Sequence, residues 1–157
     1  MELRRGAFFD RDGVINASPP PGDYVRHWDQ FRLLPETVEW IRRFNALGAP
    51  VIVVTNQRGV SRGIVEPAEL ESIHENMRAA VAARGGRIDD VFCCPHEENA
   101  CQCRKPLPGL VWRAAEKFVT HNRFFEQPQD LCDALFRRFD YVRHHPQEIE
   151  DPLHFLF

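Results

Sequence analysis

Three short apolar runs, separated by amphipathic segments, constrain the fold of this 157-residue chain more than any other feature. The runs are rich in β-branched and aromatic residues and lie at residues 6–9, 50–55 and 90–94. Such continuous apolar runs are typical of strands buried on both faces of a parallel sheet. Helical periodicity predicts helices at residues 35–48, 67–86 and 108–119. Strands that alternate with helices predict an α/β fold, a Rossmann-like open parallel sheet with flanking helices and right-handed crossovers.

The two longer helical segments each carry one apolar stripe that should pack against this sheet. The stripe of the first segment consists of Val38, Ile41, Phe44 and Leu47. The stripe of the second segment consists of Leu70, Ile73, Met77 and Val81. Gly48 should end the first helix, and His74 should lie at the surface or edge of the second.

Composition narrows the setting of the protein. The 43% of hydrophobic residues suffice for the core of one domain, which we expect to span residues 1–157. Four of the five cysteines fall between residues 93 and 103, unlike a disulfide framework, and no secretion signal or apolar stretch of about 20 residues is evident. We therefore expect a cytoplasmic protein without a membrane partner. The net charge of -3, with scattered Lys and Arg, gives no support to a nucleic-acid partner.

Polar residues follow each expected strand, where the loops of a parallel sheet converge on a ligand. They are Asp10 and Asp12 after the first strand, Thr55 and Asn56 at the second, and Arg104 and Lys105 beyond the third. Paired carboxylates with a metal suit nucleophilic and proton-transfer chemistry, whereas hydroxyl, amide and cationic groups suit phosphate. Taken singly, each group has a plainer interpretation: the aspartates cap a turn, Thr55 and Asn56 form one, and Lys105 is solvated.

A second constellation occupies the loop at residues 93–104. Its members are Cys94, His96, Cys101 and Cys103, which run directly into Arg104 and Lys105. This density of soft ligands predicts a metal site, although surface cysteines beside a histidine are the alternative. Cys93 is assigned to the strand.

Together, the segments FFDRDGVIN, VVTNQRGVSRG and CRKPLPG resemble the haloacid dehalogenase superfamily of phosphatases, in its small branch with a minimal cap. The Cys/His loop is similar to that of the zinc-containing D-glycero-D-manno-heptose 1,7-bisphosphate 7-phosphatases and the related histidinol-phosphate phosphatases. The resemblance covers residues 6 to about 119. It implies a Mg²⁺-dependent phosphomonoesterase for a small phosphorylated metabolite, with a sugar bisphosphate as first choice and histidinol phosphate as the alternative.

The resemblance also implies roles for individual residues. Asp10 would attack phosphorus and form an aspartyl-phosphate, while Asp12 would protonate the leaving group and then activate water. Mg²⁺ would contact the Asp10 carboxylate and the Asp12 backbone carbonyl. Contacts to the phosphoryl group and the rest of the substrate would come from Thr55, Asn56, Lys105, Arg104 and Tyr24. Three thiolates and one imidazole form a closed shell, so the zinc would be structural and would orient the two adjacent cations.

The C-terminal residues 120–157 depart from the family pattern and are expected to be divergent or shortened. Asp130 falls where relatives place a further Mg²⁺ ligand, but the surrounding residues equally predict a helix with Asp130 as its N-cap. The apolar residues 153–157 are a candidate surface for a homodimer. This divergence keeps open a function of another class, a catalytically impaired zinc-stabilised module that binds a phosphorylated ligand or a protein.

Overall fold

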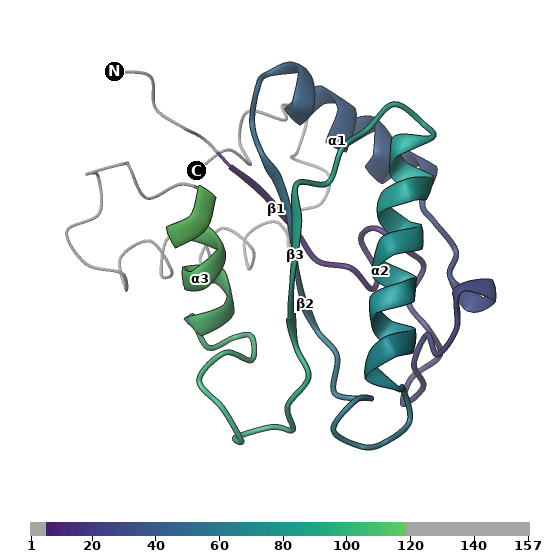
Figure 1. The fold of residues 1–157 in the computed structure, drawn as a ribbon, viewed down its shortest axis with the longest axis vertical. Helices are drawn as coiled ribbons and strands as arrows, with labels where there is room; N and C mark the ends of the chain where they lie inside the picture. The colour runs from purple at the N-terminus through teal and green to yellow at the C-terminus, as the bar shows by residue number, and fades with distance from the viewer. Residues whose placement is uncertain (1–5, 119–157) are drawn as a thin grey trace.

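The computed structural model describes residues 6–118, and these residues form a parallel sheet between two layers of helix (Figure 1). The strands are β1 (Ala7–Phe9), β2 (Val51–Asn56) and β3 (Asp90–Cys94), in the spatial order β1-β2-β3. Ala7 pairs with Val51, and Ile52 pairs with Asp90. The predicted strands are therefore confirmed to within one residue at each end.

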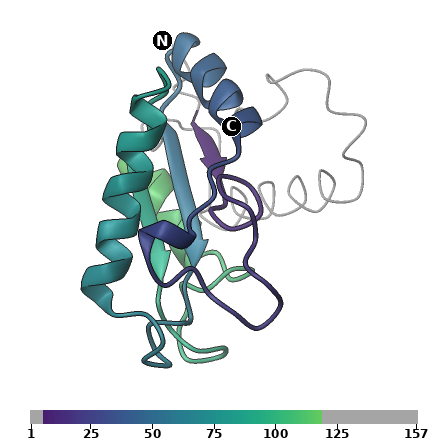
Figure 2. The same cartoon turned by 90° about the vertical axis from the view of Figure 1, so that its right-hand side faces the viewer.

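The helices follow the strands as the sequence predicts. They are α1 (Pro35–Ala46), α2 (Pro67–Ala82) and α3 (Gly109–Phe118), with a 3₁₀ helix η1 (Trp28–Gln30) before α1. A proline occupies the first turn of both α1 and α2, where its missing N–H leaves no helical hydrogen bond unmade. Helices α1 and α2 cover one face of the sheet and α3 covers the other (Figures 1 and 2). The predicted α/β architecture is thus confirmed for the described residues.

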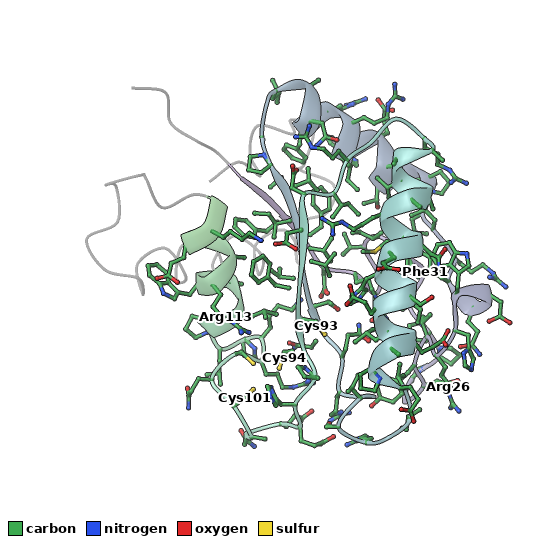
Figure 3. All side chains as sticks on the ribbon, viewed as in Figure 1. Arg26, Phe31, Cys93, Cys94, Cys101 and Arg113 are labelled. Atoms are coloured by element: carbon green, nitrogen blue, oxygen red, sulfur yellow. The ribbon has the colours of Figure 1, made fainter. Side chains whose placement is uncertain are left out.

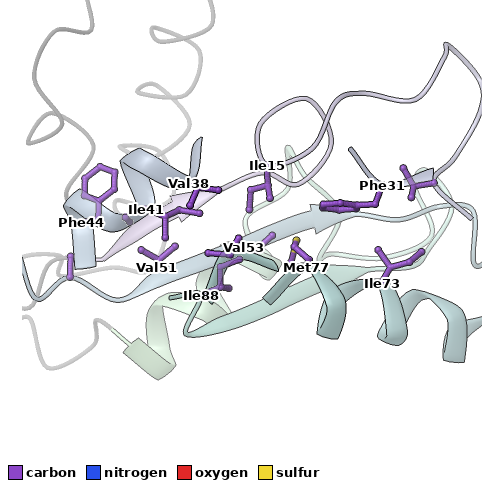
Figure 4. Packing of buried hydrophobic residues seen from close by; sticks show 14 residues of the cluster. Ile15, Phe31, Val38, Ile41, Phe44, Val51, Val53, Ile73, Met77 and Ile88 are labelled. Carbon is purple, nitrogen blue, oxygen red and sulfur yellow. The ribbon is translucent and has the colours of Figure 1, made fainter. Parts of the chain in front are cut away.

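Two apolar clusters hold these layers together, one on each face of β2. The larger cluster lies under α1 and α2 and includes Ile41, Phe44, Val51, Val53, Ile73, Met77 and Val81 (Figure 4). The smaller cluster lies under α3 and includes Phe8, Ile52, Val54, Leu110, Val111 and Ala114. Successive residues of β2 alternate between the two clusters, which explains why this strand reads as a continuous apolar run.

Two side-chain expectations for the helices are wrong. Leu47 is 54% exposed, because α1 ends at Ala46 and the chain turns at Gly48, whose φ is +74°. His74 is only 5% exposed, since it lies on the buried side of α2 with its neighbour Ile73. The buried face of α2 is thus wider than its apolar stripe.

Several predictions concern residues outside the described part of the chain. They include the Mg²⁺ contact of Asp130, the dimer surface at residues 153–157 and the extent of a single domain over residues 1–157. Among residues 6–118, no helix combines the length and apolar character needed to span a membrane.

Candidate active site and metal centre

Asp10 and Lys105, which follow β1 and β3, meet beyond the ends of the strands. The Nζ atom of Lys105 lies 2.7 Å from Oδ2 of Asp10 and also donates to the carbonyl of Val54 at 2.8 Å. The other carboxylate oxygen of Asp10 accepts the backbone N–H of Arg11 at 2.8 Å. These contacts orient the carboxylate of Asp10. Because 42% of its side chain is exposed, the carboxylate remains open to a ligand. The structure thus brings together two groups that lie 95 positions apart in sequence.

Asn56, the last residue of β2, positions Lys105. Its Nδ2 donates to the backbone carbonyl of Lys105 at 3.0 Å, and its Oδ1 accepts the backbone N–H of Lys105 at 3.0 Å. Both polar atoms of the side chain are therefore paired with one residue. The sequence did not indicate this role for Asn56.

Asp12 lies in a cradle of buried donors. Its Oδ1 accepts from Arg11 Nη2 at 2.9 Å and from Asn16 Nδ2 at 3.0 Å, while its Oδ2 accepts from Arg11 Nη2 at 3.0 Å and from Gln57 Nε2 at 2.7 Å. Gln57 Nε2 also donates to Thr55 Oγ1 at 2.9 Å. Asp12, which follows β1, and Thr55, which lies in β2, are therefore joined through a single amide group.

Two titratable side chains beside this cradle, His74 and Cys93, are held in their neutral forms. Burial, followed by the charge of Arg11, lowers the pKa of His74 to about 4, so the imidazole is neutral near physiological pH. Burial raises the pKa of Cys93 to about 12, so its thiol stays protonated. Within the described residues, Arg11 Nη1, Asn16 Oδ1 and His74 Nε2 are buried polar atoms without a hydrogen-bond partner.

The predicted metal ligands Cys94, His96, Cys101 and Cys103 converge, and their ligand atoms all lie within 4.8 Å of one another. The three sulfur atoms are 3.3 to 3.6 Å apart, and His96 Nδ1 lies 3.3 Å from Cys103 Sγ. Two sulfur atoms bound to one tetrahedral zinc at about 2.3 Å would be separated by about 3.8 Å. The donor set therefore fits a tetrahedral metal ion with only a small expansion. Figure 3 shows Cys94 at the end of β3, next to Cys93, and Cys101 in the loop that follows.

The thiols of this cluster are not equivalent. Burial acts to raise the pKa of Cys101, but hydrogen bonds from the Cys103 side chain and from the backbone N–H groups of Cys103 and Arg104 outweigh it and lower the pKa to about 6. Thiolate is the form that binds metals. Backbone donors in this loop therefore favour the thiolate form of Cys101.

Three loops interlock at the rim of the site. Arg104 Nη1 donates to the backbone carbonyl of His96 at 3.4 Å, and its Nη2 lies 3.9 Å from Glu98. Glu98 also pairs with Arg58 Nη1 at 2.6 Å, and Arg58 Nε donates to the hydroxyl of Tyr24 at 3.4 Å. The predicted substrate contacts Tyr24 and Arg104 thus belong to one rim that includes Arg58.

Sequence reasoning missed four residues of the site: Arg11, Asn16, Gln57 and Arg58. All four lie inside the strand-end segments that marked the site, so proximity to Asp12 and Thr55 was the available signal. The burial of Arg11 carried no signal, because arginine is rarely fully buried.

Comparison with known proteins identifies relatives of this chain, although no family model matches it. A D-glycero-alpha-D-manno-heptose-1,7-bisphosphate 7-phosphatase of Mycobacterium tuberculosis is 43% identical over 105 residues, which cover 66% of this chain and 55% of the relative. A D-glycero-beta-D-manno-heptose-1,7-bisphosphate 7-phosphatase of Pasteurella multocida is 31% identical over 141 residues, which cover 85% of this chain and 75% of the relative. The match thus spans just over half of the mycobacterial protein and three quarters of the Pasteurella protein.

The fold is also similar to a solved structure. The crystal structure of D,D-heptose 1,7-bisphosphate phosphatase from B. bronchiseptica, complexed with magnesium and phosphate, superposes with a TM-score of 0.66 at 37% identity. The superposition covers 71% of this chain and 62% of that one.

Proposed function

This chain belongs to the D-glycero-D-manno-heptose-1,7-bisphosphate 7-phosphatase family of the haloacid dehalogenase superfamily, and we propose that it hydrolyses the 7-phosphate of that bisphosphate. The observation that carries the proposal is the convergence of Asp10 and Lys105 at 2.7 Å beside the cradled Asp12. A carboxylate, a compensating ammonium group and a second carboxylate are the groups that phosphoryl transfer through an aspartyl-phosphate requires.

The proposed reaction has two steps. In the first, a carboxylate oxygen of Asp10 attacks phosphorus, the bond from phosphorus to the sugar oxygen breaks, and Asp12 gives its proton to that oxygen. In the second, Asp12 takes a proton from water, whose oxygen attacks phosphorus and displaces the Asp10 carboxylate. The Lys105 ammonium group reduces the repulsion between carboxylate and phosphate in both steps.

The Asp10 carboxylate and the Asp12 backbone carbonyl would hold Mg²⁺, which prefers such oxygen ligands, and Asp130 is proposed to complete its protein contacts. When bound, the ion supplies charge stabilisation for the phosphoryl oxygens. The Thr55 hydroxyl and the Asn56 backbone would bind the same oxygens. This assignment is supported by Asp10, which keeps its carboxylate partly exposed beside Lys105.

We assign a structural zinc to the four-residue cluster of Cys94, His96, Cys101 and Cys103, because its spacing fits a closed tetrahedral shell. The metal would fix the loop that carries Arg104 and Lys105. Arg104 would then contact the second phosphate of the substrate, for which a guanidinium group is suited. The free cysteines among the described residues agree with the proposed cytoplasmic location.

The test measures phosphate release by the purified chain from both anomers of D-glycero-D-manno-heptose 1,7-bisphosphate and from histidinol phosphate. Mg²⁺ is withheld in one arm instead of chelated, because a chelator would also compete for the thiolate site. We expect release from the 7-position only with Mg²⁺, and loss of release in Asp10→Asn. The matched control is Asp29→Asn in η1, which should retain activity. Turnover by Asp10→Asn, or turnover without Mg²⁺, would refute the mechanism.

A further inference from the structure

We propose that Arg11 is a positioning residue whose buried guanidinium, together with Asn16 and Gln57, fixes the Asp12 carboxylate in the orientation that exchanges a proton with the substrate. The inference rests on the proposed phosphatase function. It assigns a role in the reaction to a residue that lies between the two acids in sequence and acts through its contacts with the Asp12 carboxylate.

The burial of Arg11 is the first observation. Its side chain is 0% exposed and is the largest fully buried side chain among the described residues. Burying a guanidinium is unfavourable unless a counter-charge compensates it. The counter-charge here is Asp12, with Arg11 Nη2 at 2.9 Å from its Oδ1. A buried cation has therefore been placed on the carboxylate that is proposed to move the proton.

The geometry of the contact is the second observation. Arg11 reaches Asp12 through Nε at 3.2 Å and through Nη2 to both oxygens, while Asn16 and Gln57 each hold one oxygen. Rotation of the carboxylate would break hydrogen bonds to all three side chains. A general acid must first be placed correctly before its protonation state matters. The cradle meets this requirement and leaves 27% of the Asp12 side chain exposed for the substrate.

The turn after β1 depends on the backbone of Arg11 and does not require its guanidinium group. The backbone carbonyl of Arg11 accepts the N–H groups of Val14, Ile15 and Asn16 and so shapes the turn after β1. Any residue at position 11 would supply that carbonyl. The side chain therefore has a function apart from the turn, and its hydrogen bonds to Asp12 indicate that this function is to hold that carboxylate.

The test separates protonation of the leaving group from binding and folding. Single-turnover release of the leaving group, with enzyme in excess, is measured for heptose 1,7-bisphosphate and for p-nitrophenyl phosphate. The sugar oxygen needs a proton as it leaves, whereas p-nitrophenolate leaves as a stable anion. Arg11→Lys keeps the charge and loses the planar fork. We expect it to slow sugar release at least about tenfold more than p-nitrophenol release, since general acid catalysis contributes about 10²-fold or more.

Gln57→Leu removes another of the three side chains that hold Asp12 and should shift the ratio of the two rates in the same direction. If circular dichroism shows that Arg11→Lys does not fold, the rate ratio of Gln57→Leu tests the inference in its place. The control is Arg78→Lys, because Arg78 is a structural arginine of α2 that donates to the carbonyls of Ile88 and Asp89. Its ratio should equal that of the unaltered chain.

Equal slowing of both substrates in Arg11→Lys and Gln57→Leu would overturn the inference and leave Arg11 a structural role. Inactivity of the unaltered chain towards both substrates would be a different result. It would overturn the proposed function, and the inference with it.

Discussion

Two acids that lie two residues apart have different energetic surroundings. Asp10 pairs with Lys105, and both side chains are partly exposed, so solvent screens the pair and it contributes about 0 to 1 kcal/mol. Asp12 pairs with Arg11, whose side chain is wholly buried. Removal of one partner of a buried pair costs about 3 to 5 kcal/mol, because the other charge is left uncompensated. Of the two acids, only Asp12 should therefore be important for stability.

The difference predicts unequal effects of two alanine substitutions. Asp12→Ala should lower the free energy of unfolding by about 3 kcal/mol, since it leaves the buried guanidinium of Arg11 without its counter-charge. Asp10→Ala should lower it by less than about 1 kcal/mol. Urea unfolding followed by circular dichroism measures both values. If Asp12→Ala lowered the free energy of unfolding as little as Asp10→Ala does, another group would have to compensate the charge of Arg11.

His74 predicts an acid-sensitive term in stability. Its pKa is about 4 in the folded chain and 6.5 as the reference value, so the unfolded chain binds the proton more tightly. The stabilising effect of the neutral imidazole is complete above the unfolded pKa and declines as the pH falls from 6.5 towards 4. As the pH falls from about 7 to about 5, this term should lower the free energy of unfolding by about 2 kcal/mol.

The control for this term is His74→Leu, which removes the titrating group and retains an apolar side chain at a buried position. Urea unfolding at both pH values gives the change in stability for each protein. The unaltered chain should lose about 2 kcal/mol more than the variant over this range. An identical loss in both would mean that His74 becomes protonated in the folded chain without penalty.

At the scale of helices and strands, the sequence predicts position better than it predicts ends. The sequence predicts strand β2 well, because burial on both faces demands apolar residues at every position. The spacing extends α1 too far, because Leu47 continues the apolar stripe after the last helical residue, Ala46. Its exposure depends on the turn at Gly48, which spacing alone does not describe.

The site divides in the same way. The convergence of Asp10 and Lys105 could be predicted, because the carboxyl ends of parallel strands share one edge of the sheet. The partners of each side chain could not, because they depend on rotamers and on burial. Asn56 was predicted to contact phosphate and its side chain pairs with the Lys105 backbone, while Arg11 was overlooked and cradles Asp12.

At the scale of the whole described region, the proposed zinc belongs to one layer of the molecule. Cys94, Cys101 and Cys103 pack in the smaller apolar cluster with Leu110 and Val111 of α3. Helix α3 starts against this loop: Gly109 donates to the carbonyl of Gln102 at 3.1 Å, and a Cβ at this position would overlap that carbonyl. The larger cluster under α1 and α2 contains none of the four ligands. The two faces of the sheet should therefore respond differently to metal loss.

Metal removal should loosen the α3 layer and spare the other. After a chelator extracts the metal, we expect amide hydrogen exchange to accelerate in residues 95–118, because the loop then loses the bonds that fix its shape. Exchange in α1 and α2 should change little, since the larger cluster in which they pack contains none of the four ligands. Hydrogen exchange measured by mass spectrometry, before and after zinc is restored, gives both rates.

Two cysteines, one inside the four-residue cluster and one outside it, supply the matched variants for this experiment. Cys103→Ser removes a ligand and should reproduce the pattern of the chelated protein with less than one zinc bound per chain. Cys93→Ser alters a thiol on β3 that lies outside the four-residue cluster, so it should keep its zinc and its protection. If chelation instead accelerated exchange in α1 and α2 as strongly as in α3, the metal would stabilise the sheet as a whole. The loop would then unfold together with the rest of the described region, and the zinc would not serve specifically to orient Lys105.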